Sequence, residues 1–481
     1  MMRAQSVILR ASIALLLAAA PAAPARAQAP DGTTPLHMAV RNDDVEAARR
    51  LVQGGASVAA PNRYGVTPAM LAAANGSAAM LQLLLDAGAD ANSASKEGET
   101  LLMSAARSGS EAAVRQLLAR KADPNRKESW LEQTALMWAA ADNHAAVAAA
   151  LIDAGADVNA RAKVLTGAPP RPRGSETAFQ ASHSNFPRGG FTSLLFAAQY
   201  GSADVVRVLA DRGADLNLPD PDGLTPMMMA IVNGHYDTAA VLLEKGADAN
   251  RLDKSGRGAL YFAVDMNSLE WLFSRPSPRP SGDLTPVDMV KRLLDRGANP
   301  NAQIAARPFI LHHNATGHPS LVEGTTPFMK AASTLDVVLM RLLIERGANP
   351  NLTTKNKTTP LMLAAGLEWR DIASLGTEDE SIEAMKICLE HGADVNAVND
   401  LGETALHGAA QRGADRVVQF LADQGATLDA KNKEGRTPMD EAIGQLEETV
   451  ATARRPVRES TRELLARLMA QRLSRSSSPA R

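Results

Sequence analysis

The sequence predicts an all-α solenoid, built from about eleven stacked copies of one helix–turn–helix unit. A segment of about 33 residues recurs along the chain, most cleanly as "GADVNAVNDLGETALHGAAQRGADRVVQFLADQGATLDA" between Gly392 and Ala430. Each copy contains two short apolar faces that neither helix can bury alone, so neighbouring copies must stack. Because a solenoid grows by adding repeats, the 481 residues need not divide into several globular domains.

The local chemistry of one copy explains this assignment. Asn399 and Gly402 fit the two ends of a β-turn, and Thr404 can cap the exposed N–H groups of a first helix. Gly413 breaks that helix, and Gly425 ends a second helix in the left-handed conformation. The apolar positions of the two helices are Leu406, Ala409, Ala410, Val417, Val418 and Leu421.

The capping position can be located in every copy. The residues there are Thr34, Thr67, Thr100, Thr134, Thr192, Thr225, Gly258, Thr326, Thr359, Thr404 and Thr437. Six of them are followed by proline, which is well tolerated at the first helical position. With "TPLHMAV" at Thr34 and "TALHGAA" at Thr404, the pattern resembles the ankyrin repeat family.

Methionine usually replaces the histidine of that family's signature. It does so at Met70, Met103, Met137, Met228, Met329 and Met362. Methionine packs readily between helices, so we expect these side chains in the core. Successive copies would hold them about 8–10 Å apart, too far to share a metal ion.

Residues 1–27 have the features of a secretory signal peptide. Arg3 and Arg10 charge its start, an apolar run follows, and "ARA" offers a cleavage site before Gln28. Without this leader, 48 basic residues face 53 acidic ones, and no basic excess indicates nucleic-acid binding. The single cysteine, Cys388, cannot form an internal disulfide. We expect an exported, periplasmic or secreted bacterial protein that is monomeric and has no membrane-spanning segment once mature.

The repeat domain is expected over residues 28–444, with four insertions at 164–190, 267–288, 304–324 and 366–380. Two of them lengthen turns and two separate the helices of one repeat. Loops of this length in a compact solenoid are often functional. The resemblance implies that turns and first helices line a concave binding face, so we expect a partner protein at the two turn insertions. The predicted anchors are Trp130, Phe186, Arg188, Phe309, His312 and His313.

We predict Trp130 as an anchor because it stands at a turn tip where glycine is usual. Packing against the neighbouring turn is an equally good interpretation of this residue. The segment "TEDES" at 377–381 could bind a cation, but acids at a helix N-terminus are favourable in themselves, and we prefer that structural role.

No catalytic motif is present, and no cofactor is predicted. We therefore expect a non-enzymatic scaffold that binds another protein. The alternative is a small-molecule, metal or catalytic site built from the insertions, with His312, His313 and His318 as candidate ligands.

Residues 445–481 are expected to form a C-terminal helix and a disordered basic tail. Val457, Thr461, Leu464, Leu465 and Leu468 recur at helical spacing. We prefer a helix that covers the last repeat, because solenoid ends need covering. A basic amphipathic helix that binds a membrane surface or an acidic partner is the alternative.

Overall fold

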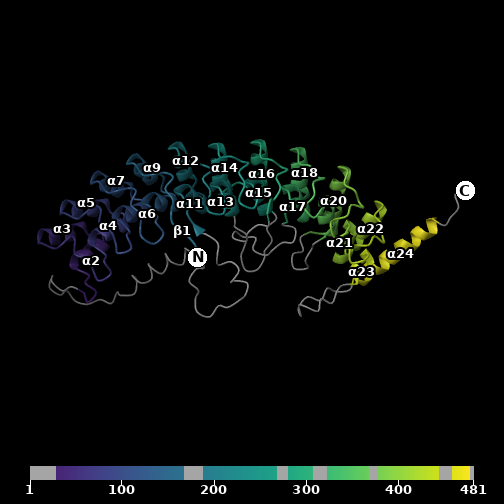
Figure 1. Cartoon of the computed structure of the whole chain (residues 1–481). Coiled ribbons are helices and arrows are strands. Elements are labelled where there is room, and N and C mark those ends of the chain that lie inside the picture. The colour runs from purple at the N-terminus through teal and green to yellow at the C-terminus, as the bar shows by residue number, and fades with distance from the viewer. Residues whose placement is uncertain are drawn as a thin grey trace. The chain divides into compact units, whose positions relative to one another are not determined.

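The computed structural model describes residues 29–166, 188–267, 280–306, 322–367, 376–443 and 458–476. The chain divides into two compact units, Met1–Asp123 and Pro124–Arg481. Figure 1 shows the helices of each unit, coloured in chain order. The predicted signal peptide, residues 1–27, lies outside the described residues.

The first unit contains three helix–turn–helix repeats. Their helices are α2 (Pro35–Arg41), α3 (Val45–Gln53), α4 (Pro68–Asn75), α5 (Ala78–Asp86), α6 (Leu101–Ser108) and α7 (Glu111–Ala119). The first helices α2, α4 and α6 contact one another in sequence, and so do the second helices α3, α5 and α7. The unit therefore has two helical layers, as the stacking of repeats requires.

The second unit continues the same pattern. Its first helices are α8 (Ala135–Ala141), α11 (Ser193–Tyr200), α13 (Pro226–Val232), α15 (Ala259–Asn267), α17 (Pro327–Ser333), α19 (Pro360–Ala365), α21 (Ala405–Arg412) and α23 (Pro438–Ala442). Its second helices are α9 (Ala145–Asp153), α12 (Ala203–Asp211), α14 (Tyr236–Glu244), α16 (Pro286–Asp295), α18 (Val337–Glu345), α20 (Glu378–Glu390), α22 (Asp415–Asp423) and α24 (Glu459–Ser476). Two strands, β1 (Val164–Leu165) and β2 (Arg188–Gly189), pair antiparallel. The predicted all-α repeat solenoid is confirmed.

The predicted capping threonines begin the first helices. All ten are N-cap residues, and Thr67 is typical, its Oγ1 accepting the N–H of Met70 at 3.3 Å. In the turn before Thr404, the Asn399 side-chain oxygen accepts the N–H groups of Leu401 and Glu403, both at 2.9 Å. The local sequence signals therefore fix the start of each repeat.

The histidine position of the signature links successive repeats. His407 Nδ1 accepts the N–H of Thr404 at 3.1 Å, so Nε2 carries the proton and donates to the carbonyl of Arg436 at 3.2 Å. Methionine can supply only the first of these bonds, as Met362 Sδ does for the N–H of Thr359 at 3.4 Å. The six methionines are buried, which confirms the prediction that they belong to the core.

The stack continues past the insertion in repeat seven. The side chain of Asn250 accepts the N–H of Asn299 at 2.7 Å and donates to the carbonyl of Gly297 at 2.9 Å. Asn301 makes the same two bonds with Asn349 and Gly347, at 2.7 and 3.0 Å. These asparagine side chains align each turn with the next, so the extra residues leave the stack intact.

At the base of each turn insertion, the two chain segments that enter and leave it are joined by backbone hydrogen bonds. Val164 of β1 is opposite Gly189 of β2 in the antiparallel ribbon. In the second insertion, the N–H of Ile304 donates to Thr325 at 3.0 Å, and the N–H of Gly324 donates to Ile304 at 2.7 Å. Their central parts, 167–187 and 307–321, lie outside the described residues.

Helix α24 occupies the second-helix position of repeat eleven. Its buried Leu464, Leu465 and Leu468 have the spacing of Val417, Val418 and Leu421 in α22, and α24 packs against α22 and α23. The Arg472 guanidinium also donates to the carbonyls of Ala422 and Ala426, both at 2.8 Å. The apolar face on which a membrane-binding role would depend is therefore buried against the repeats.

Candidate functional site

Trp130 is the most exposed aromatic residue among those the structure describes. It lies in the turn that precedes α8, and 68% of it is accessible to solvent. The left-handed residue of this turn is Glu132, with φ of 55°. The prediction that Trp130 occupies the usual glycine position is therefore wrong. Trp130 therefore projects from the turn, and the alternative of packing on the adjacent turn is wrong.

A buried carboxylate holds this turn in place. Glu128 is 8% exposed, and its two oxygens accept the N–H groups of Trp130 at 2.6 Å, Leu131 at 2.8 Å and Gln133 at 2.9 Å. Asparagine does this work in the turn of repeat ten, where Asn399 accepts two N–H groups. Charge-assisted bonds of this kind are stronger than neutral ones, so the Trp130 backbone is well fixed.

The next turn places a second exposed apolar residue close to the backbone of the Trp130 turn. The N–H of Lys163 donates to the carbonyl of Leu131 at 2.7 Å, so the chain that enters β1 runs alongside the Trp130 turn. Val164, the first residue of β1, is 44% exposed. A Cβ added to Gly190 would come within 2.8 Å of its Cγ2 atom, so Val164 rests on backbone. We call Trp130, Val164 and the backbone that supports them the Trp130 edge.

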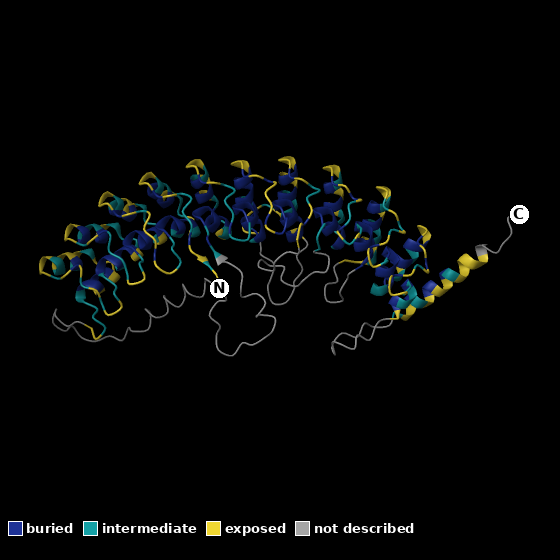
Figure 2. Ribbon diagram, viewed as in Figure 1, coloured by how far each residue is buried: buried dark blue, intermediate teal, exposed yellow. Residues whose placement is uncertain are grey.

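The first helices offer much less accessible surface. The fourth residue after each cap is 44% exposed in α2, where it is Met38, but it is buried in α11 to α19. Figure 2 shows the first helices of the second unit as largely buried. The buried residues are Phe196, Met229, Phe262, Lys330 and Leu363. In this part of the chain the face that the family resemblance implies for binding is therefore not accessible at these positions.

The buried first-helix face contains an ion pair. Lys330 Nζ lies 2.8 Å from Asp265 Oδ1, and their side chains are 6% and 9% exposed. A second buried pair joins Arg257 to Asp253 at 2.8 Å, with the Arg257 guanidinium 4.6 Å from the centre of the Phe262 ring. Each charge has its counter-charge within the chain, which indicates a structural role.

Most of the other predicted anchors cannot be placed. Phe186, Phe309, His312 and His313 lie outside the described residues, as does His318 of the alternative metal site. Only the backbone of Arg188 is described; it lies in β2, opposite Leu165. Of the six predicted anchors, the structure therefore places only the Trp130 side chain.

The acidic segment 377–381 serves the helices. Thr377 caps α20, and Glu380 bonds back to the N–H of Thr377 at 2.6 Å. Glu378 reaches the neighbouring repeat and accepts the N–H of Arg416 at 2.8 Å, at the start of α22. No group of three or more His, Cys, Asp or Glu residues suited to a metal ion occurs within the described ranges.

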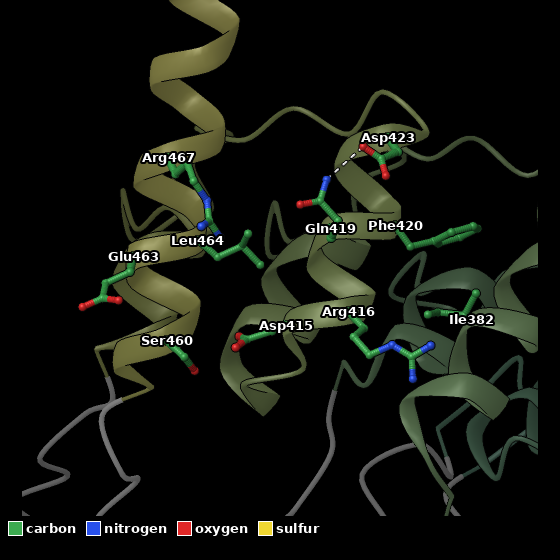
Figure 3. A pocket seen from close by; sticks show the side chains of 10 residues that line it. All are labelled: Ile382, Asp415, Arg416, Gln419, Phe420, Asp423, Ser460, Glu463, Leu464 and Arg467. Carbon is green, nitrogen blue, oxygen red and sulfur yellow. Dashed lines mark hydrogen bonds between the residues drawn. The ribbon is translucent and has the colours of Figure 1, made fainter.

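An open groove of about 540 Å³ lies between α20, α22 and α24 (Figure 3). Leu464 of α24 points toward α22, the Arg467 side chain runs along α24 toward Leu464, and Phe420 points to the side where Ile382 of α20 lies. Asp415 accepts a bond from Thr461 at 2.5 Å, and Gln419 donates to Asp423 at 2.9 Å. The first of these bonds joins α24 to α22 and the second lies within α22, and the groove offers no converging catalytic set.

Burial perturbs several titratable groups, but they do not form a catalytic cluster. Burial raises the pKa of Asp220 to about 6, against the bonds from the Leu224 and Asp222 N–H groups to its carboxylate. Burial also raises the pKa of the Cys388 thiol to about 12, so this cysteine is protonated and unreactive. The described helices include none long and apolar enough to cross a membrane.

Comparison with known families agrees with the repeat geometry. A model of three ankyrin repeat copies matches residues 8–95, 70–162, 194–277 and 371–452, and a single-repeat model matches 323–355. Together these matches span more than half of the chain.

The chain belongs to the ankyrin repeat family. It is 35% identical over 103 residues to the fruit-fly (Drosophila melanogaster) ankyrin repeat and KH domain-containing protein mask, which covers 21% of this chain and 2% of that protein. It is 32% identical over 162 residues to human ankyrin repeat and SOCS box protein 16, covering 34% and 29%. The mouse B-cell lymphoma 3 protein homolog is 30% identical over 173 residues, covering 32% and 36%. This ankyrin repeat chain thus matches 36% or less of the length of each relative.

The crystal structure of the human ASB11 ankyrin repeat domain is similar to 56% of this chain and 99% of its own, with 21% identity and a TM-score of 0.41. Sequence reasoning about the ankyrin repeat chain missed Glu128, the residue that fixes the Trp130 turn. Glu128 begins its turn as Asn62 and Asn399 begin theirs. An acid in place of asparagine at the first residue of a turn was therefore the sequence signal that could have identified it.

Proposed function

We propose that this chain is a non-enzymatic scaffold of the bacterial cell envelope or periplasm that binds another protein through its turn tips and inserted loops. Ankyrin repeats generally mediate protein–protein interaction. The observation that carries the proposal here is the Trp130 edge, where a 68% exposed indole stands on a turn fixed by a buried carboxylate. Tryptophan is strongly enriched among residues that dominate binding energy.

Preorganisation makes this edge suitable for recognition. Three N–H bonds to Glu128 and the Lys163–Leu131 backbone bond hold the turn before any partner arrives. Little ordering entropy is then lost on association. The leader-like sequence of residues 1–27 supports export, and so the partner is sought among envelope proteins.

A capture experiment tests the proposal. The mature protein and a variant lacking residues 167–187 and 307–321 are incubated with envelope extract, and circular dichroism checks that both keep their helices. We expect a partner that binds the intact protein and is weakened or lost in the variant. Capture of no partner by the intact protein would contradict the scaffold function.

Equal capture by both proteins would move recognition away from the inserted loops and onto the repeat surface. The Trp130→Ala variant then locates the site, because its side chain is exposed and its removal leaves the repeat core unchanged.

A further inference from the structure

We infer that the Trp130 edge recognises an acidic segment of the partner protein, one that carries a large apolar side chain between its carboxylates. This inference rests on the proposed protein-binding function and names the chemistry of the partner. It follows from the charges that surround Trp130 and Val164 and from the few acids that the chain places against them.

Two cations that lie close to Trp130 and Val164 in the sequence have no acidic partner among the described residues. Arg126 and Lys163 are exposed, and neither forms an ion pair in this part of the structure. Lys163 immediately precedes Val164, and its backbone N–H is bonded to Leu131, so this residue lies at the junction of the two segments.

Two more cations donate to backbone carbonyl groups. Arg161 donates to the carbonyls of Gly190 and Pro219, both at 2.9 Å. Lys127 donates to the carbonyl of Arg161 at 2.8 Å, and among the described residues it forms one loose ion pair, at 3.8 Å, with Glu132. Carbonyl bonds orient these groups without neutralising them.

The acids near this edge are occupied or lie further along the chain. Glu128 is buried beneath three backbone N–H groups, and Glu132 is the loose partner of Lys127. The following turn tip carries Asp222. Burial raises the pKa of this carboxyl, and the positive charge of Lys254 acts against that rise, so Asp222 has a cation near it. The two segments that carry Trp130 and Val164, residues 124–132 and 161–165, contain four cations and two acids, Glu128 and Glu132, so these segments carry a net positive charge.

Repeat ten shows that such a turn can be neutral. Its tip residue Leu401 is 57% exposed, and Lys433 donates its N–H to Leu401 at 2.8 Å, the counterpart of the Lys163–Leu131 bond. There Asp400 pairs with Lys357 at 3.1 Å, and Glu434 lies 3.7 Å from Arg436. The positive charge at the Trp130 edge is therefore not imposed by the repeat fold.

Synthetic peptides test the inference. Fluorescently labelled peptides of 12 residues carry six, three or no glutamates around a central phenylalanine or alanine, and fluorescence polarisation measures their binding to the mature chain. We expect affinity to rise at least about tenfold from no glutamate to six, to need phenylalanine, and to weaken as salt is raised.

Matched charge variants assign the effect to this edge. The double substitution Arg126→Glu with Lys163→Glu should reduce binding of the six-glutamate peptide about tenfold or more, and Trp130→Ala should do the same. Lys431→Glu with Lys433→Glu makes the same charge change in the turn of repeat eleven and should leave binding unchanged. The unfolding temperature of all these variants should equal that of the wild type.

Three outcomes would overturn the inference: no peptide binds, binding ignores the number of glutamates, or both double variants lose affinity equally. If Trp130→Ala abolishes capture of the envelope partner in the same study, the proposed function stands and only the acidic character of the partner is wrong. If the peptides fail and no partner is captured, both fail.

Discussion

Two regions of this chain treat charged side chains in opposite ways. In repeats seven and eight, Asp253 meets Arg257 and Asp265 meets Lys330, all four buried. At the Trp130 edge, Arg126 and Lys163 stand exposed without a carboxylate partner among the described residues. The first pair lies in a turn and the second joins the first helices α15 and α17, whereas Arg126 and Lys163 lie in turn segments. The difference indicates that the chain satisfies its own charges where it needs stability and leaves them unpaired where we propose that a partner binds.

The buried pair should give the largest effect when broken. Asp265→Ala leaves the Lys330 ammonium buried without its counter-charge, which costs about 3–5 kcal/mol. Urea unfolding followed by circular dichroism measures the change. The exposed pair of Arg341 and Glu383 is the control, and Glu383→Ala should cost less than about 1 kcal/mol. A loss of less than about 1 kcal/mol in Asp265→Ala would show that this buried pair is not structural.

Removal of the carboxylate beneath Trp130 should come next. Glu128→Ala leaves three N–H groups without their acceptor, and we expect a loss of about 1–3 kcal/mol. Hydrogen exchange at Trp130, Leu131 and Gln133 should accelerate, while the amides of α13 stay protected. Glu128→Gln should restore part of the protection, because one amide oxygen can still accept. Unchanged exchange in Glu128→Ala would remove the basis for calling this turn preorganised.

Asp220 and Asp253 begin consecutive turns and should respond in opposite directions to the same substitution. Asp220→Asn keeps an acceptor for its two N–H groups and removes a buried charge, so it should stabilise by about 1–3 kcal/mol at pH 7. Asp253→Asn removes the counter-charge of Arg257 and should destabilise.

The Asp220 effect has a defined pH dependence. Its pKa is about 6 in the folded chain and 3.8 in the unfolded chain, so the folded state binds the extra proton between these values. As the pH falls from 7 to 4, the free energy of unfolding of the wild type should therefore rise relative to that of the Asp220→Asn variant. Parallel pH profiles of the two proteins would show that Asp220 is not the group responsible.

The smallest effect is expected at the inter-repeat histidine. His407→Met keeps an acceptor for Thr404 but loses the bond to the Arg436 carbonyl, which costs about 0.5–1.5 kcal/mol. Burial lowers the pKa of His407 in the folded chain, so the unfolded chain binds the proton first as the pH falls below 6.5. Wild type should lose stability relative to His407→Met below that pH, and an identical acid profile would contradict this.

The repeat period, the caps and the core methionines could be predicted because each depends on local chemistry written in every copy. A threonine at the position of Thr404, for example, caps the first helix in each repeat where it recurs. Trp130 could be singled out by its type and place in a turn, but not its exposure, which depends on how Glu128 and the neighbouring β1 strand hold that turn. The burial of Lys330 could not be predicted either, because its partner Asp265 lies 65 residues earlier and meets it only through stacking.

The most direct test of the account compares two exposed apolar residues for binding of the captured envelope partner. Trp130 and Val338 are 68% and 65% exposed, the first at the Trp130 edge and the second on α18. Isothermal titration should show about 30-fold weaker binding for Trp130→Ala, equivalent to about 2 kcal/mol, and no change for Val338→Ala. Wild-type affinity in Trp130→Ala, or an equal loss in both variants, would contradict the account.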